Sequence, residues 1–316
     1  VAGNYVSEKL WRRSDFINYN GLFARTTGRR AYNKTMLLDD GMLNYGTETF
    51  SEEPDEMLVT HLSESIGQFS EYLETRDIPF TFVLAPVKED LEGELIPEGF
   101  HNYQNETGDQ LLSRIKEKKI DTLDLRGFLT QNAGQSEKYF YRTDHHWTTD
   151  AALAAYRCFA LEAFLTDSTR DYERLPVTDS FQGTLSASAG FRTNQKDSIY
   201  MYLPVQGSET EYVMTDMDTG EKSPSLFFTS FLDTRDKYAM FMGGNHGEVK
   251  IQTAADSDRN ILVFKDSYAN CFIPFMVKDF RSITVIDLRY FQGDYQQLAE
   301  DPDLTDILFI YNAQTL

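Results

Sequence analysis

Ile261-Leu262-Val263-Phe264 is a run of four apolar residues, followed directly by Lys265-Asp266-Ser267-Tyr268-Ala269-Asn270. The apolar run predicts a buried strand, and the residues from Cys271 onward resume at helical spacing. The turn between them lies at the carboxyl edge of a sheet, where open α/β folds bind their ligands. There a serine hydroxyl is exposed, and the free N–H groups of the following helix favour a developing negative charge. The pattern suits a nucleophile at Ser267.

The pair Asp266-Ser267 also fits an ordinary helix cap. Aspartate and serine are common N-cap residues because their side-chain oxygens accept hydrogen bonds from the unpaired N–H groups of the first turn. On this stretch alone the cap interpretation is favoured. A catalytic interpretation needs a base elsewhere in the chain.

The composition is that of an acidic globular protein. The 316 residues carry a formal net charge of -20, which argues against nucleic acid, anionic membrane surfaces and polyanions as general partners. Cys158 and Cys271 lie in apolar helical stretches, so buried free thiols are expected, with one disulfide as the open alternative. No apolar run is long enough to cross a bilayer. Because the chain starts at Val1 rather than Met, we expect that an N-terminal signal or anchor has been removed.

Strands alternate with helices from residue 51 onward, and this alternation predicts a doubly wound parallel sheet of flavodoxin-like type. The sheet is expected to have five buried strands, at 80–85, 120–125, 261–264, 283–287 and 307–310. Residues 1–50 are expected to form an N-terminal extension with a hairpin at an Asp-Gly turn. The α/β domain spans 51–316, with 168–255 as a β-rich insertion or lid.

Two of the five histidines, His145 and His146, lie in a loop before a predicted helix that begins near Ala151. In Asp144-x-His146 the two side chains can point the same way from an extended loop, so that the carboxylate reaches the imidazole. A serine nucleophile needs an imidazole to take its proton and a carboxylate to fix the tautomer of that imidazole. The sequence therefore predicts Ser267 as nucleophile, His146 as base and acid, and Asp144 as the residue that orients His146.

Two other interpretations of Asp144, His145 and His146 stay open. The three side chains offer zinc ligands, although adjacent histidines rarely both reach one ion and no third histidine has suitable spacing. Alternatively, the run Asp144–Trp147 is structural: it begins the next helix and packs its tryptophan in the core.

The run Tyr141–Thr148 is similar to the signature of the DHHW family. Further similarities to that family cover nearly the whole chain and lie at 18–33, 181–183, 243–246, 265–270 and 286–291. Such proteins resemble the SGNH-hydrolase-like domains of alginate O-acetyltransferases of the AlgX and AlgJ type. The resemblance implies an SGNH-hydrolase-like fold with a permuted motif order. In that order Asp144 and His146 match the Asp-x-His pair that precedes the serine, and Ser267 matches the serine.

One departure from ordinary SGNH enzymes is the block Lys265–Tyr268, which lacks the glycine before the acidic residue. The oxyanion donors would then be the Ser267 N–H and either Gly183 or Asn245. Asn245 is preferred because a side-chain amide in a glycine turn can aim at an oxyanion, and a place in a tight left-handed turn is its alternative role. The other substrate-binding candidates are His145, Trp147, Tyr268, Arg289 and Tyr290. For the aromatic residues among them, packing in the core is the alternative role.

These observations lead to one hypothesis and two alternatives. The hypothesis is an extracytoplasmic serine-dependent O-acetyltransferase or esterase that acts on a cell-surface polysaccharide through an acyl-Ser267 intermediate. No cofactor is expected. The expected partners are the glycan and, by the resemblance, a membrane-bound acyl carrier system, with no nucleic acid and with membrane contact only through the missing anchor. The alternatives are a non-catalytic glycan-binding or scaffold protein of an envelope complex, and an esterase for small soluble esters.

Overall fold

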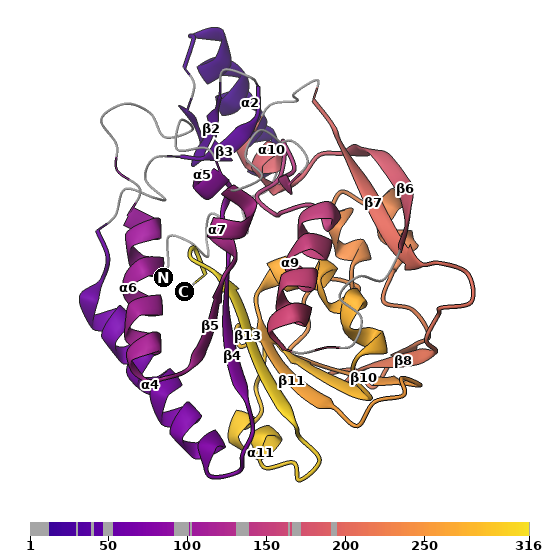
Figure 1. Ribbon diagram of the computed structural model, residues 1–316. Coiled ribbons are helices and arrows are strands. Elements are labelled where there is room, and N and C mark those ends of the chain that lie inside the picture. The colour runs from indigo at the N-terminus through magenta and orange to yellow at the C-terminus, as the bar shows by residue number, and fades with distance from the viewer. Residues whose placement is uncertain are drawn as a thin grey trace.

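A mixed sheet of eight strands forms the centre of the protein in the computed structural model (Figure 1). The structure describes residues 13–29, 31–38, 41–46, 53–91, 101, 103–130, 139–163, 165, 172–190 and 195–315. Five neighbouring strands run parallel, in the order β5 (Asp121–Asp124), β4 (Phe80–Ala85), β13 (Asp306–Asn312), β11 (Asn260–Lys265) and β12 (Ser282–Ile286). Beyond β12 follow three antiparallel strands, β10 (Glu248–Thr253), β8 (Tyr212–Asp216) and β9 (Lys222–Ser223).

All five strands expected from the sequence are present as neighbours, but the sheet has eight strands rather than five. The additional strands differ from the parallel ones in their apolar pattern. Most positions of β10 alternate between buried and half-exposed, as in an antiparallel strand with one solvated face. That pattern carries no indication that β10 pairs with β12.

The segment 168–255, expected as an insertion or lid, divides into two parts. β6 (Tyr172–Phe181) and β7 (Asp197–Pro204) form a separate antiparallel ribbon. β8, β9 and β10 instead belong to the central sheet. These three strands are therefore not a lid, because their backbone hydrogen bonds continue the sheet past β12.

Side chains alternate along the parallel strands and give the sheet two buried faces. On β11, Leu262 and Phe264 join the cluster that includes α4 (Glu56–Glu74), α6 (Tyr103–Glu117) and α11 (Tyr295–Ala299). Ile261 and Val263 join the opposite cluster, which includes α9 (Thr149–Glu162). Both faces are thus covered, as expected for an α/β fold with a parallel core.

The segment behind Ser267 differs from the single helix that the apolar spacing predicts. It consists of two short 3₁₀ segments, η4 (Ser267–Cys271) and η5 (Ile273–Lys278). Pro274 lies at the start of η5 and has no N–H to donate, which prevents one continuous α-helix from forming through this region. α9 begins as expected, because Thr148 caps it by accepting from the Ala151 N–H.

The N-terminal extension lies against the loop that carries the histidines. It contains α2 (Arg13–Thr26) and a three-stranded sheet of β1 (Ala31–Tyr32), β2 (Thr35–Leu37) and β3 (Leu43–Tyr45). β2 and β3 form the expected hairpin, in which Gly41 has a φ of +84°; Asp39, Asp40 and residues 1–12 lie outside the described residues. Leu43 packs with α10 (Thr184–Ala189), and its N–H donates to the Arg142 carbonyl at 2.8 Å.

Further short helical segments are α5 (Lys88–Leu91), α7 (Leu125–Thr130), η2 (Thr229–Asp233) and η3 (Tyr238–Met240). Cys158 and Cys271 both carry free thiols, so the alternative of a disulfide between them does not hold. Within the described part of the chain, no helix combines the length and the apolar character needed to span a membrane.

Candidate active site

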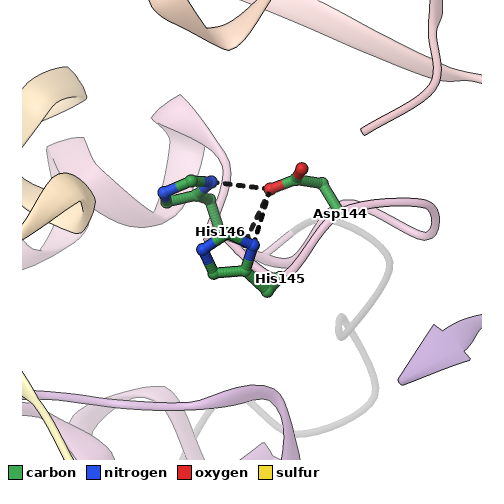
Figure 2. Close-up of side chains that lie close together, drawn as sticks. All are labelled: Asp144, His145 and His146. Carbon is green, nitrogen blue, oxygen red and sulfur yellow. Dashed lines mark hydrogen bonds and ion pairs between the residues drawn. The ribbon is translucent and has the colours of Figure 1, made fainter. Parts of the chain in front are cut away.

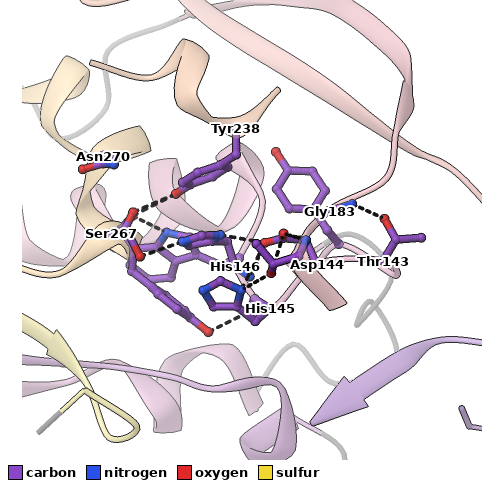
Figure 3. A network of polar contacts seen from close by, with 12 residues as sticks. Thr143, Asp144, His145, His146, Gly183, Tyr238, Ser267 and Asn270 are labelled. Atoms are coloured by element: carbon purple, nitrogen blue, oxygen red, sulfur yellow. Dashed lines mark hydrogen bonds and ion pairs between the residues drawn. The ribbon is translucent and has the colours of Figure 1, made fainter. Parts of the chain in front are cut away.

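His146 contacts Ser267 with one ring nitrogen and Asp144 with the other (Figure 3). Nε2 lies 2.8 Å from Ser267 Oγ, and Nδ1 lies 2.6 Å from Asp144 Oδ1. The same carboxylate oxygen accepts from the His146 backbone N–H at 2.9 Å. Figure 2 shows how Asp144, His145 and His146 share one short loop. The fold thus brings together the three side chains that the sequence singled out, although His146 and Ser267 are 121 residues apart.

The second oxygen of Asp144 is held by the start of α10. Thr184 donates its N–H at 2.6 Å and its hydroxyl at 3.0 Å to Asp144 Oδ2. Burial alone raises the pKa of Asp144, but the neighbouring His146 and His145 rings and the hydrogen bonds from His146 outweigh burial and hold that pKa well below its usual range. Asp144 is therefore a carboxylate in the folded protein.

Two buried charged residues that the sequence did not indicate anchor the loop. Asp197 accepts from two successive backbone N–H groups of the loop, at 2.7 and 2.8 Å. Lys88 Nζ donates to three backbone carbonyls at 2.8 Å each, those of Leu43, Tyr141 and Asp144. Neither residue belongs to a motif. The one available signal is that Lys88 follows β4, at the carboxyl edge of the sheet.

Asp266, rather than Ser267, caps the turn behind the serine. Its Oδ1 accepts from the Tyr268 N–H at 2.8 Å, and its Oδ2 accepts from the backbone and side-chain N–H groups of Asn312, both at 2.8 Å. The cap interpretation therefore holds for Asp266 and leaves the hydroxyl of Ser267 to His146. Ser267 itself is half-buried.

Tyr238, another residue that the sequence did not indicate, holds the histidine ring and the serine backbone. Its ring stacks on the His146 imidazole, with centroids 3.9 Å apart and planes inclined by 11°. Its hydroxyl donates to the Ser267 carbonyl at 3.1 Å. Burial raises the pKa of the Tyr238 hydroxyl well above its usual range, so the proton stays on the phenol. Tyr238 lies in η3, within the segment expected to be a lid.

Two aromatic candidates for sugar stacking are core residues. Trp147 is 0% exposed and Tyr268 1% exposed, and Trp147 Nε1 donates to the Tyr268 carbonyl at 2.8 Å. The Tyr268 hydroxyl donates to the His145 carbonyl at 2.6 Å, so these rings tie the serine turn to the histidine loop. His145 lies against the His146 ring, with centroids 3.9 Å apart. Burial and the adjacent His146 ring lower the pKa of His145 to about 3, which keeps the His145 ring neutral.

Arg289 and Tyr290 have contacts other than the three central side chains. Arg289 forms a two-point ion pair with Asp287, with nitrogen–oxygen distances of 2.8 and 2.6 Å. Tyr290 is half-exposed, and the Arg289 guanidinium lies 5.6 Å from the centre of its ring. Among the described residues, no hydrogen bond or ring contact connects either of them to His146 or Ser267.

The two oxyanion candidates differ in their surroundings. The Gly183 N–H already donates to Thr143 Oγ1 at 3.1 Å. Asn245 is exposed and follows a left-handed turn made by Met242, Gly243 and Gly244, with φ values of +60°, +80° and +102°. Asn245 is not among the residues with positive φ. The left-handed conformation of the turn is therefore adopted by Met242, Gly243 and Gly244. Asn245 is not the left-handed residue, so its alternative role in the turn does not hold.

Metal binding has to be weighed at this loop, since ligand atoms of Asp144, His145 and His146 lie within 4.8 Å of one another. Both ring nitrogens of His146 already have partners in Asp144 and Ser267. His145 Nδ1 lies 2.7 Å from Thr184 Oγ1. Adding an ion would require these hydrogen bonds to break, so the donor set fits a hydrogen-bonded serine better than a metal centre.

Comparisons with known proteins identify the family of the chain. The family model described as the SGNH hydrolase-like domain of the acetyltransferase AlgX matches residues 39–230. This range is more than half of the chain and includes Asp144 and His146, but it ends before Ser267. A comparison with curated proteins found no match.

Several solved structures are similar in fold. The structure of Bacillus cereus PatB1 has 20% sequence identity and a TM-score of 0.75, covering 89% of this chain and 97% of that one. A DHHW family protein from Eubacterium siraeum has 24% identity and a TM-score of 0.69, covering 90% and 92%. The O-acetyltransferase domain of Pseudomonas putida AlgJ has 13% identity and a TM-score of 0.53, covering 89% and 91%. The chain belongs to the family of SGNH hydrolase-like domains represented by the acetyltransferase AlgX.

Proposed function

We propose that the protein is a serine-dependent O-acetyltransferase in which Ser267 is the nucleophile, His146 the general base and acid, and Asp144 the orienting carboxylate. The observation that carries this proposal is the hydrogen-bonded chain from Ser267 Oγ through His146 to Asp144, at 2.8 and 2.6 Å. A scaffold has no need to hold these three groups in line. The similarity to the acetyltransferase AlgX and to the O-acetyltransferase domain of AlgJ supports acetyl as the transferred group.

The reaction proceeds in two steps through an acetyl-serine. Ser267 Oγ attacks the carbonyl carbon of the acetyl donor while His146 Nε2 takes the hydroxyl proton. The Asp144 carboxylate stabilises the imidazolium, which then gives the proton to the leaving group as its bond to the acetyl carbon breaks. In the second step His146 takes the proton of an acceptor hydroxyl, that oxygen attacks the acetyl carbon, and the imidazolium returns the proton to Ser267 Oγ as the acetyl–serine bond breaks. The Ser267 N–H is a donor to the oxyanion of both steps.

The acceptor that this proposal favours is a hydroxyl of a cell-surface polysaccharide, outside the cytoplasm, with the acetyl group supplied by a membrane-bound acyl carrier system. This acceptor follows from the resemblance of the sequence to alginate O-acetyltransferases of the AlgX and AlgJ type. If water replaces the sugar hydroxyl, the same site acts as an esterase. Exclusion of water during the second step decides between the two outcomes.

The test is covalent labelling of Ser267 by a sulfonyl fluoride, read by intact mass and peptide mapping. This reagent class is chosen because PatB1 has been solved with a sulfonyl adduct. One adduct on Ser267 is expected in the wild type and in Ser65→Ala, a control in the exposed part of α4. No adduct is expected in Ser267→Ala or His146→Ala. An unlabelled wild type, under conditions that label a known serine hydrolase, would contradict the proposal and favour the scaffold.

A second measurement separates transfer from hydrolysis. The protein is incubated with p-nitrophenyl acetate, with and without an oligosaccharide acceptor, and the sugar is analysed by mass spectrometry. An acetylated sugar, formed only when Ser267 is present, is the expected product. Acetate alone would assign an esterase.

A further inference from the structure

A lysine side chain is buried directly before the serine turn. Lys265 ends β11 and its side chain is 2% exposed. Its Nζ lies 2.7 Å from Asn270 Oδ1, 3.3 Å from Asp287 Oδ2 and 3.4 Å from Asn245 Oδ1. An ammonium group has three donors and no acceptor, so three surrounding oxygens match its bonding capacity. The acyl transfer proposed above makes no use of this residue.

These contacts determine which way the two asparagine amides point. A lysine ammonium repels an amide NH₂ and accepts nothing from it, so both asparagines must turn their Oδ1 atoms toward Nζ. Asn270 then has its NH₂ directed to the Gly244 carbonyl at 3.3 Å and to Asn245 Oδ1 at 3.0 Å. Asn245 receives both of these donors, from Lys265 and Asn270, on its oxygen alone.

The NH₂ group of Asn245 consequently takes no part in the hydrogen bonds of this network. No acceptor for Asn245 Nδ2 exists among the described residues, and the residue is exposed. Asn245 is joined to the serine turn by its hydrogen bond with Asn270, which belongs to the same 3₁₀ segment as Ser267. An amide donor without a partner at this edge is available to a negatively charged oxygen.

The backbone that carries Asn245 is held in a conformation that few residues adopt. Met242 has a φ of +60° and is followed by two glycines with positive φ, which is typical of segments whose strain serves a site. His246 fixes this turn: its Nε2 lies 2.9 Å from the Met242 carbonyl and its Nδ1 lies 2.8 Å from Asp216 Oδ2. His246 is therefore part of the structure that holds the turn.

We propose that Lys265 is a positioning residue that orients the Asn245 amide, so that its NH₂ stabilises the oxyanion formed at Ser267. The inference rests on the proposed acyl transfer. It assigns a role to the lysine that replaces the glycine of ordinary SGNH enzymes, and it makes Asn245 the donor that complements the Ser267 N–H. Asn270 acts through Asn245 by holding its oxygen.

The first test is Asn245→Asp, which separates a donor from a structural role. A carboxylate at position 245 still pairs with the Lys265 ammonium, so the turn keeps its anchor. It has no N–H to give to an oxyanion. We expect kcat for acetylation of Ser267 by p-nitrophenyl acetate to fall about 10²–10³-fold, with KM and the melting temperature close to wild type. Asn260→Asp, at the far end of β11, is the matched control and is expected to retain wild-type kcat.

The second test is a double-mutant cycle between Lys265→Met and Asn245→Ala. Since Lys265 acts through Asn245, Lys265→Met should lower kcat strongly in the wild-type background and only slightly when Asn245 is already alanine. Melting temperatures are recorded for all four proteins, and the Asn245→Asp result remains decisive if Lys265→Met does not fold.

Three results are informative. A wild-type kcat in Asn245→Asp would overturn the role of Lys265 while leaving the acyl transfer intact. The same conclusion would follow if Lys265→Met and Asn245→Ala lowered kcat independently, so that the double variant showed the product of the two single effects. An unacylated wild type would overturn both proposals, and the sulfonyl fluoride experiment identifies that case. A loss of kcat in Asn245→Asp, together with non-additive effects of Lys265→Met and Asn245→Ala in the cycle, supports the assignment.

Discussion

Gly183 lies against the carboxylate of Asp144. A Cβ atom at position 183 would be 2.1 Å from Asp144 Oδ2 and 2.5 Å from its Cγ, far inside van der Waals contact. Asp144 is held on its other side by His146, at 2.6 Å from Nδ1. The glycine therefore serves the site by leaving room for the carboxylate, rather than as the oxyanion donor that its sequence position suggested.

Gly183→Ala should displace Asp144 and so misplace the His146 ring. We expect kcat to fall about 10²-fold, because small displacements of a reacting group have effects of that size, while KM changes little. Gly127→Ala is the matched control: position 127 lies in α7 and no atom is found within 4 Å of its added Cβ. Steady-state kinetics with p-nitrophenyl acetate compares the two. A Gly183→Ala protein with wild-type kcat would show that the position of Asp144 does not matter.

Tyr238 offers a way to separate ring stacking from hydrogen bonding at His146. Tyr238→Phe keeps the stacked ring and loses the 3.1 Å bond to the Ser267 carbonyl, so the rate of Ser267 acylation should fall about 2–10-fold, the worth of one hydrogen bond. Tyr238→Leu also removes the ring and should lower the rate about 10²-fold. Stopped-flow acylation measures both. Equal rates for the two variants would mean that stacking does not hold the imidazole.

Lys88 should be a stability residue of the catalytic loop. Lys88→Met leaves three buried carbonyls, including that of Asp144, without their shared donor, and each unsatisfied buried group costs about 1–3 kcal/mol. We expect the free energy of unfolding to fall by about 3 kcal/mol or more, measured by urea denaturation. Lys222→Met, at an exposed lysine, is expected to change it by less than about 0.5 kcal/mol. Similar losses in both variants would contradict an anchoring role for Lys88.

The parts of the fold and of the site that could be predicted are those encoded by residues close together in the sequence. Asp144 and His146 are two residues apart, so one loop places both side chains, and Ser267 directly follows an apolar run that is a central strand. Buried parallel strands are continuous apolar runs, which is why strands such as β4 and β11 were visible in the sequence. In these cases the chemistry and the fold are encoded by residues that are close in the chain.

The parts that the sequence did not indicate depend on contacts between distant residues. Lys88 bonds to the Asp144 carbonyl across 56 residues, and Asp197 bonds to the Thr143 N–H across 54. Nothing near either residue in the chain marks it as a partner. Tyr238 likewise reaches Ser267 across 29 residues from a segment without a motif. For Trp147 and Tyr268 the sequence left both substrate binding and core packing open, because an aromatic residue looks the same in the sequence whether it is buried or exposed.

Asp90 should make the stability of the protein depend on pH. Its Oδ2 accepts from the Val87 N–H at 2.7 Å, whereas its buried Oδ1 has no hydrogen-bond partner among the residues that the structure describes. Burial raises the pKa of Asp90 from 3.8 to about 7, against the Val87 hydrogen bond and the charge of Arg126. Between these two values the unfolded chain has lost the proton that the folded chain keeps. The folded state therefore binds more protons, and this group lowers stability as the pH rises from about 4 to about 7.

Asp90→Asn replaces the carboxyl by a neutral group of the same shape and should remove this dependence. At pH 4 the variant and the wild type should melt at similar temperatures, because Asp90 is neutral in the folded protein. At pH 8 the wild type carries the buried charge, and the variant should melt about 4 °C higher or more. Melting curves at several pH values test this, with Asp258→Asn as the control because Asp258 is fully exposed. A difference between Asp90→Asn and wild type that is constant from pH 4 to 8 would show that Asp90 does not titrate in that range, since only a proton bound in the folded state makes the difference grow with pH.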